Sequence, residues 1–384
     1  MFNNLSEKFE RIKGFYYDEY KDLPNICDVL KSEFEAQKFI FDYSKSGMKE
    51  KLALCFKDDN IKNKGIITTR HRHSVALYYL GCHLKEILTP YLDSINNLIA
   101  DEYKEESFLY TWFLTCLYHD LAVPLESQKV KDSKSINKLI DKVFNHKFSG
   151  SKNKRSLYYC KTLIINYLKY RKSNGKIDHG IYAGSFLFDS FCKNYRDAEE
   201  KFGKIKRDKN TNAQFTVTKP ELSYILVFNP GLIDHFNVVA QTIMCHNIWN
   251  VVEGINILED IKLYKENKLD SLIISGNEKG KKINLYKWPL LFFLDLLDSI
   301  EPFKSFPDHD IKSIFKNIAI NYDETNKVLT IEANKDEFCS KDFFIWTNKI
   351  RDLQNWMDLI VNEEQAGNAI KLELQFNPYE DKEE

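Results

Sequence analysis

Six residues whose side chains commonly bind metal ions lie within apolar stretches of the chain or begin them. A buried imidazole or carboxylate without a partner costs on the order of 1–3 kcal/mol, so we expect each of these side chains to have one. A shared metal centre would serve all six, and imidazoles with carboxylates suit Mn, Fe, Co, Ni or Zn alike. We therefore expect one or two divalent transition-metal ions, bound by His73, His119, Asp120, His179, His246 and Asp298.

Helices are expected to position these residues, because apolar residues recur at helical spacing around each of them. Pro90 and Pro124 mark the ends of the first two segments. Between the later segments, residues 204–219 are polar and basic and are predicted to form an exposed loop. The predicted helices span 70–89, 107–119, 157–170, 181–202, 233–252 and 288–303.

The pattern changes near Phe315, where apolar residues begin to alternate with polar ones, as in a strand. A turn-like segment, 323–326, separates two such strands, and a helix with one apolar face between Phe343 and Ile360 follows them. A last alternating segment spans 370–376. This order predicts a small α+β unit of type ββαβ attached to a mostly α protein. We expect a helical extension in 1–65, the main helical domain in 66–312 and the ββαβ unit in 313–384.

Composition excludes several classes of protein. The 384 residues contain 55 Lys and Arg against 56 Asp and Glu, which argues against a protein that coats nucleic acid over its whole surface. The eight cysteines form no C-x-x-C pair, so zinc ribbons and thioredoxin-type redox sites are unsupported. The N-terminus is polar, and the longest apolar run, 288–300, contains two aspartates and is too short to span a bilayer. We expect a cytoplasmic protein without a membrane partner.

A His-Asp dipeptide occurs twice, so the dipeptide alone is not specific. His119 and Asp120 end an apolar helical segment, whereas His309 and Asp310 lie in FPDHDIK between a proline and charged residues. We interpret the second pair as part of a loop. The informative feature is the order of the first pair among the other candidates: a histidine, the His-Asp pair, two further histidines and an aspartate, each on a separate helix.

The segments that carry these residues resemble the HD superfamily of metal-dependent phosphohydrolases. TRHRHSVALYYLG resembles the family's first-histidine helix, LYHDLAVPLE its His-Asp step and LLFFLDLLDSIEP its final-aspartate helix. The resemblance covers about residues 66–303 and implies an HD-type helical bundle. It also implies that His73, His119, Asp120 and Asp298 bind one metal ion. His179, in DHGIYAG, and His246, in CHNIW, resemble the extra ligands of binuclear members, with Asp120 bridging the two ions.

Two carboxylates near the end of the resemblance leave alternatives open. Asp295 lies three residues before Asp298 on the same helical face and competes with it as the final ligand. The residues Ile300, Glu301 and Pro302 after Asp298 match the motif that follows the family's final aspartate, which favours Asp298. Glu301 is a candidate hydrogen-bond partner for a ligand histidine, since carboxylates commonly accept from such histidines at metal sites.

The resemblance implies hydrolysis of a phosphate ester or phosphodiester by a metal-bound hydroxide, with Asp120 as a catalytic residue. Arg70 resembles the phosphate-contacting arginine of nucleoside triphosphate triphosphohydrolases, and Arg70 or Arg72 could hold a phosphate oxygen. The Leu-Ala-Val after Asp120 and the lack of a Gly-Tyr-Pro motif disfavour the cyclic-dinucleotide branch.

A substrate of the nucleotide or nucleic-acid class is expected, either a phosphorylated small molecule or an oligonucleotide. Residues 152–176 contain eight Lys or Arg and no acidic residue. This segment is either a solvated basic surface or a positively charged region that attracts an anionic substrate toward the site. Two other functions stay open: a catalytically silent HD-fold regulatory or ligand-binding module, and a nuclease subunit of a nucleic-acid-processing complex.

Overall fold

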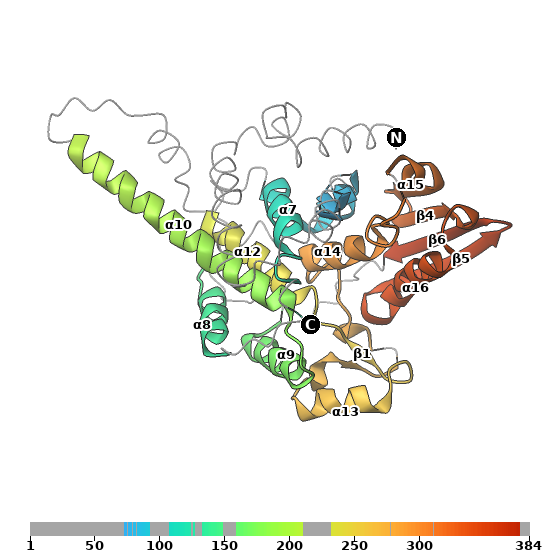
Figure 1. The fold of residues 1–384 in the computed structure, drawn as a ribbon, viewed down its shortest axis with the longest axis horizontal. Coiled ribbons are helices and arrows are strands. Elements are labelled where there is room, and N and C mark those ends of the chain that lie inside the picture. The colour runs from blue at the N-terminus through green and yellow to red at the C-terminus, as the bar shows by residue number, and fades with distance from the viewer. Residues whose placement is uncertain are drawn as a thin grey trace.

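A computed structural model of the chain is mostly helical and has a small antiparallel sheet near the C-terminal end, as the sequence predicts (Figure 1). It describes residues 73–92 except 75, 79 and 82, and residues 107–123, 126, 133–148, 159–209, 232–276, 278–309 and 311–376. The predicted N-terminal extension, 1–65, lies outside these residues. Among the described helices, none has both the length and the apolar character needed to cross a membrane.

The chain begins, where it is described, with helical residues between 73 and 83 and two 3₁₀ turns at Lys85–Ile87 and Thr89–Tyr91. The longer helices are α7 (Ser107–Tyr118), α8 (Ser133–Phe144), α9 (Lys161–Ser173), α10 (His179–Lys209), α12 (Leu232–Cys245), α13 (Leu258–Glu266), α14 (Pro289–Ile300), α15 (Ile311–Asn317) and α16 (Ser340–Trp356). Further 3₁₀ turns lie at Asp270–Leu272, Lys279–Lys281 and Lys335–Glu337. The strands are β1 (Val251–Val252), β2 (Ile273–Ile274), β3 (Ile318–Asp323), β4 (Val328–Asn334), β5 (Leu359–Ala366) and β6 (Ala369–Phe376).

Two glycines allow α10 to lie directly against α12, and the two helices run side by side in Figure 1. A Cβ atom added at Gly180 would come 2.5 Å from the main-chain oxygen of Ile243, and one added at Gly184 would come 2.4 Å from that of Ala240. These glycines lie about one turn apart on α10. The start of α10, at His179, is therefore held next to the end of α12.

The helix that contains His73 packs against α7 through a similar close approach. The indole N–H of Trp112 donates a hydrogen bond of 3.2 Å to the main-chain oxygen of Tyr78. A Cβ atom added at Gly81 would overlap the same indole ring, 2.0 Å from its nitrogen. This contact fixes the first described helix relative to α7.

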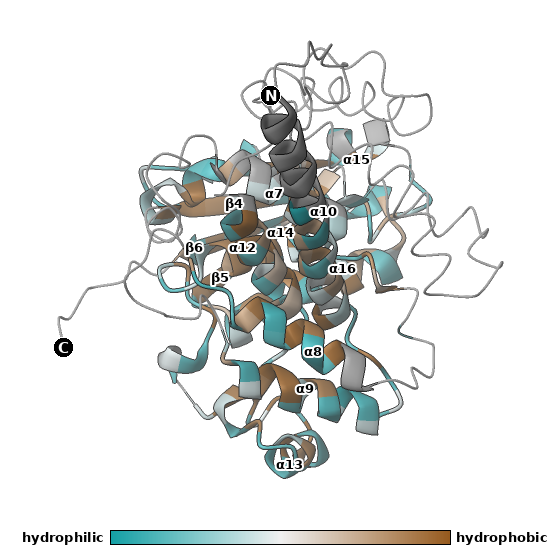
Figure 2. Cartoon of the chain, turned by 90° about the vertical axis from the view of Figure 1, so that its left-hand side faces the viewer, coloured by the Kyte–Doolittle hydropathy of each residue, from teal (hydrophilic) through white to brown (hydrophobic). Residues whose placement is uncertain are grey.

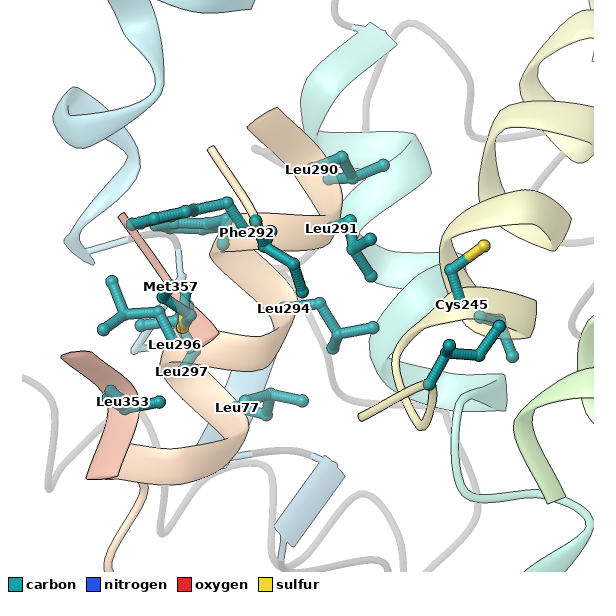
Figure 3. Packing of buried hydrophobic residues seen from close by; sticks show 14 of the residues in the cluster. Leu77, Cys245, Leu290, Leu291, Phe292, Leu294, Leu296, Leu297, Leu353 and Met357 are labelled. Atoms are coloured by element: carbon teal, nitrogen blue, oxygen red, sulfur yellow. The ribbon is translucent and has the colours of Figure 1, made fainter. Parts of the chain in front are cut away.

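Helix α14 forms the centre of the molecule. Proline at its first position suits a helix N-terminus, and every residue of the helix except Asp298 is buried. Apolar residues lie on nearly every side of this helix, as is typical of a helix in the interior of a protein. Figure 3 shows its leucines between Leu77 on one side and Leu353 and Met357, from the α16 segment, on the other. Figure 2 shows hydrophobic residues dominating α12 and α14, whereas α8 and α9 alternate between hydrophobic and hydrophilic residues, as helices with one outward face do.

The four-stranded sheet has the order β3-β4-β6-β5, and every pair is antiparallel. Ile331 of β4 lies opposite Ile320 of β3 and Leu372 of β6, so one face of the sheet is apolar and buried. The predicted turn between β3 and β4 is confirmed, because the Asp323 carboxylate accepts hydrogen bonds from two main-chain N–H groups of that turn. The sheet and α16 belong to the same buried hydrophobic cluster as the helices before them.

The predicted order ββαβ is incomplete, because the structure has a fifth element, giving ββαββ. The missing strand is β5, and Ile360, predicted on the face of the helix, lies in this strand because α16 ends at Trp356. The first three residues of β5 and its last, Ala366, are apolar, and all its side chains from Asn362 onward are exposed at the edge of the sheet. An edge strand of this kind carries little of the alternation by which buried strands are recognised.

Several helix boundaries also differ from the prediction; α9, for example, spans 161–173 and not 157–170. Residues 204–209, predicted as the beginning of a loop, continue α10, while 210–219 lie outside the described residues. Helix α12 ends at Cys245 and not near 252, because the chain turns at 246–247 toward β1. The sequence prediction did not include α8 or α13. The turn after α12 places His246 at a helix end, not in the middle of a helix.

Candidate metal centre

The six predicted ligands come together, and five of them lie at or next to the end of a helix. His179 begins α10, and Asp298 lies in the last turn of α14. His119 and Asp120 lie in the turn that follows α7, and His246 lies in the turn that follows α12. His73 lies in the helical segment described between 73 and 83.

Three of the side chains form a first cluster, whose ligand atoms all lie within 4.8 Å of one another. Nε2 of His73 lies 3.2 Å from Nε2 of His119 and 2.9 Å from Oδ1 of Asp298. Nε2 of His119 lies 3.8 Å from the same carboxylate oxygen. Both imidazoles are buried. Two ring nitrogens and one carboxylate oxygen thus face one point in the interior.

A second cluster is formed by Asp120, His179 and His246. Nε2 of His179 lies 3.4 Å from Oδ1 of Asp120 and 3.3 Å from Nε2 of His246. The other oxygen of Asp120, Oδ2, faces the first cluster and lies 3.6 Å from Nε2 of His119. One carboxylate therefore presents one oxygen to each cluster.

Each histidine is oriented by an acceptor at its other ring nitrogen. Nδ1 of His119 lies 3.0 Å from the main-chain oxygen of Cys116, and Nδ1 of His246 lies 2.7 Å from that of Ile243, three residues earlier in both cases. A carbonyl oxygen only accepts, so Nδ1 carries the proton in both rings. The lone pair of Nε2 is then directed into the cluster, as metal ligation requires.

Glutamates hold the other two histidines. Nδ1 of His73 lies 2.7 Å from Oε2 of Glu301, and Nδ1 of His179 lies 2.7 Å from Oε1 of Glu126. Each cluster therefore contains one imidazole held by a main-chain carbonyl and one held by a carboxylate. A carboxylate behind a ligand histidine fixes the orientation of the ring and raises the basicity of the ligand nitrogen.

The pKa values of the histidines separate into two pairs. Burial lowers the pKa of His119 to about 4 and that of His246 to about 3. Burial acts in the same direction on His73 and His179, but hydrogen bonds to Asp298 and Glu301, and to Asp120 and Glu126, outweigh it and raise both pKa values to about 9. Each cluster therefore has one neutral and one protonated imidazole near pH 7. A bound metal ion takes the place of such a proton.

Both candidate carboxylates are held in the ionised form. Burial alone would raise the pKa of Asp298, but the ammonium groups of Lys304 and Lys349 and the imidazole of His73 hold it well below its usual range. Burial likewise opposes ionisation of Asp120, and His119 and His179 overcome it. Both residues are therefore available as anionic ligands at neutral pH.

Asp295, the alternative final ligand, is not part of either cluster. Its side chain is buried and its Oδ2 has no hydrogen-bond partner. Burial and the charge of Asp298 raise the pKa of Asp295 well above the usual range, which disfavours its ionised form. The structure thus directs Asp298, and not Asp295, toward the histidines.

The spacing of the donor atoms suits metal ions. Ligands bonded to one ion at about 2.0–2.2 Å lie roughly 3–4 Å from one another. The separations given above for the two clusters, 2.9–3.8 Å, are close to this range. Three nitrogen or oxygen donors per cluster leave room for further ligands, as at catalytic metal sites. His73, His119, Asp298 and Asp120 fit a first ion, and Asp120, His179 and His246 fit a second.

Other residues considered from the sequence lie elsewhere. Arg70 and Arg72, the candidate phosphate contacts, lie outside the described residues. His309 lies in a turn after α14, where its Nε2 contacts the main-chain oxygen of Glu337, and it belongs to neither cluster. Of the two histidines in His-Asp dipeptides, His119 therefore lies at the centre and His309 does not.

Several residues at the centre were not found from the sequence. Glu126 is separated from His179 by 53 residues, and Lys304 and Lys349 contact Asp298 from a turn and from α16. The amide nitrogen of Asn247 lies 2.7 Å from Nε2 of His179. Polar residues in loops and on helix surfaces are common, so none of these has a distinctive local signal, although Asn247 directly follows a predicted ligand.

Comparisons with known proteins do not add a family to this description. No protein-family model, curated protein or solved structure matches the chain. The resemblance to the HD superfamily therefore stays a prediction from the sequence.

Proposed function

We propose that this protein is a metal-dependent phosphohydrolase of the HD type that cleaves a phosphate ester or phosphodiester of a nucleotide or nucleic acid. The observation that carries the proposal is the carboxylate of Asp120, which presents one oxygen to each of two His-containing clusters. Two adjacent metal positions that share a carboxylate are typical of enzymes that transfer or hydrolyse phosphoryl groups.

The residues around the centre support this chemistry by fixing the ligands before any substrate arrives. When bound, divalent ions would polarise phosphoryl oxygens and lower the pKa of a water molecule. The glutamates and main-chain carbonyls behind the histidines hold the rings in place, which limits the reorganisation that metal and substrate binding require. Arg70 and Arg72 remain candidate contacts for the substrate phosphate.

A substrate panel tests the proposal. The protein is loaded with Mn, Fe, Co, Ni or Zn and incubated with mononucleotides, cyclic dinucleotides and single-stranded oligonucleotides. We expect hydrolysis of at least one class, its loss in His119→Ala and its retention in His309→Ala, a histidine outside both clusters. If the metal-loaded protein hydrolyses none of them, the result favours the non-catalytic regulatory module, and cleavage of oligonucleotides alone favours the nuclease subunit.

A further inference from the structure

Helix α16 is attached to the end of α14 that carries Asp298. The indole N–H of Trp346 donates to the main-chain oxygen of Ile300 at 3.2 Å, and the ammonium group of Lys349 donates to that of Asp298 at 2.9 Å. The last carbonyl groups of a helix have no partner within it. Helix α16 supplies hydrogen-bond donors for two of these carbonyl groups. The ammonium group of Lys349 therefore contacts Asp298 both at its main-chain oxygen and at its carboxylate.

A second lysine reaches the same carboxylate from the turn after α14. The Glu301 carboxylate accepts hydrogen bonds from the main-chain N–H of Phe303, at 2.6 Å, and of Lys304, at 3.2 Å. The same carboxylate holds His73. The main chain of Lys304 is therefore fixed relative to the candidate ligands, and its ammonium group lies 3.0 Å and 3.2 Å from the two oxygens of Asp298.

The two ammonium groups lie on the accessible side of the centre. The side chains of His73 and His119 are at most 2% exposed, whereas that of Asp298 is 17% exposed and those of Lys304 and Lys349 are 36% and 34% exposed. Both ammonium nitrogens contact the same oxygen, Oδ2 of Asp298, so they lie close together. One carboxylate, which also contacts His73, faces both positive charges.

We propose that Lys304 and Lys349 form an anion-binding site that holds a phosphate group of the substrate beside the metal centre. A phosphate group offers several oxygens and carries up to two negative charges, so it can contact two ammonium groups and the metal centre together. This inference rests on the proposed phosphohydrolase function and deepens it. It gives the C-terminal unit a role, because α16 contributes one of the two cations.

A second attachment, at the C-terminal end of α16, further constrains the position of Lys349. Near the end of the helix, the main-chain N–H of Ile283 donates to the oxygen of Trp356 at 2.9 Å, and the N–H of Asp358 donates back to Ile283 at 2.9 Å. Leu353 and Met357 pack in the same hydrophobic core as α14 (Figure 3). Lys349 lies between these contacts and those of Trp346, so its main chain is constrained on both sides.

Binding of inorganic phosphate and inorganic pyrophosphate to the metal-loaded full-length protein tests the site without turnover. The variants are Lys304→Met, Lys349→Met and the double variant, and the matched control is Lys341→Met, an exposed lysine near the start of α16. We expect the dissociation constant from titration calorimetry to rise about tenfold in each single variant, as for loss of one charged hydrogen bond. We expect a rise of about a hundredfold in the double variant and no change in the control.

Metal content and the melting temperature, measured on the same samples, separate an anion site from a purely structural contact. We expect the metal content of Lys304→Met and Lys349→Met to equal that of the wild type, since neither lysine donates to a metal. If Lys349→Met does not fold, Lys349→Arg carries the test: it should bind phosphate within about threefold of the wild type, while Lys304→Met still loses affinity.

The inference is overturned if phosphate does not bind the wild type, or if it binds folded Lys304→Met and Lys349→Met as tightly as the wild type. These outcomes are distinct from failure of the proposed function. If the variants bind phosphate more weakly but the wild type hydrolyses no substrate, the anion site is supported and the phosphohydrolase function is contradicted. If the wild type hydrolyses a substrate but the variants bind phosphate as tightly as the wild type, the function is supported and the anion site is contradicted.

Discussion

Oε2 of Glu301 lies 2.7 Å from Nδ1 of His73, although 228 residues separate them in the chain. Glu301 directly follows α14 and is buried. The C-terminal end of that helix and the residue after it therefore supply both a candidate ligand, Asp298, and the carboxylate that orients another. The first described helix and the C-terminal end of α14 therefore meet at the first cluster.

Replacing Glu301 with Gln should weaken metal binding at the first cluster by about 10- to 100-fold, because a neutral amide holds the imidazole less firmly and makes Nε2 less basic. Competition with a chelator measures this affinity. Glu337→Gln, an exposed glutamate in a 3₁₀ turn, is the control and should bind metal as the wild type does. Equal affinities in both variants would show that the Glu301–His73 contact is not part of the site.

The four histidines should make the stability without metal depend on pH, and their combined contribution should be greatest near pH 6.5. His73 and His179 have pKa values raised to about 9, so the stability that they contribute is complete below 6.5 and is lost as the pH rises through 9. His119 and His246 have lowered pKa values, so the unfolded state takes up protons first and stability falls as the pH drops below 6.5. Asp120 and Asp298 stay ionised throughout this window.

The effect of each raised pKa is on the order of 3 kcal/mol between the two ends of its window. Urea unfolding of chelator-treated protein, from about pH 5 to about pH 9, gives the free energy of unfolding directly. A free energy of unfolding that rises steadily up to pH 9 would contradict the assigned protonation states.

Gly180→Ala should distort the second cluster. The new methyl group would lie 2.5 Å from the main-chain oxygen of Ile243 and 2.9 Å from the ring of His246, and neither the main chain nor the buried ring is free to move far. We expect a loss of stability of about 1–3 kcal/mol, typical of overpacking, and less metal at the second position. Gly280→Ala is the control, because no atom lies within 4 Å of a Cβ atom there. A Gly180→Ala protein as stable as the control would show that α10 and α12 are not packed this closely.

The candidate ligands were predictable because each stands out against an apolar helical background, and burial forces such groups to find partners. The same reasoning separated His119–Asp120 from His309–Asp310, whose surroundings are polar. It did not reveal Glu126, Lys304 or Lys349. These side chains are partly exposed in turns or on a helix surface, where charged residues are ordinary, and only the folded chain brings them to the centre.

For the fold as well, local sequence patterns predict some helices and strands and miss others. Helix α7 was predicted to within one residue and α14 to within three, since their long apolar runs stand out from the polar residues around them. Strand β5 was missed because its pairing with β6, and not its own sequence, makes it a strand. The end of α12 was misplaced because the apolar residues of β1 continue the hydrophobic pattern beyond the helix.

The most direct test of the central claim is the metal content per chain, measured by elemental mass spectrometry on protein purified without added metal or chelator. The two clusters joined by Asp120 predict close to two transition-metal ions per chain, and His119→Ala should lose most of them. About one ion in the wild type would limit the site to one cluster. A wild-type chain that contains no metal, and takes up none on dialysis against Mn, Fe or Zn, would contradict the account.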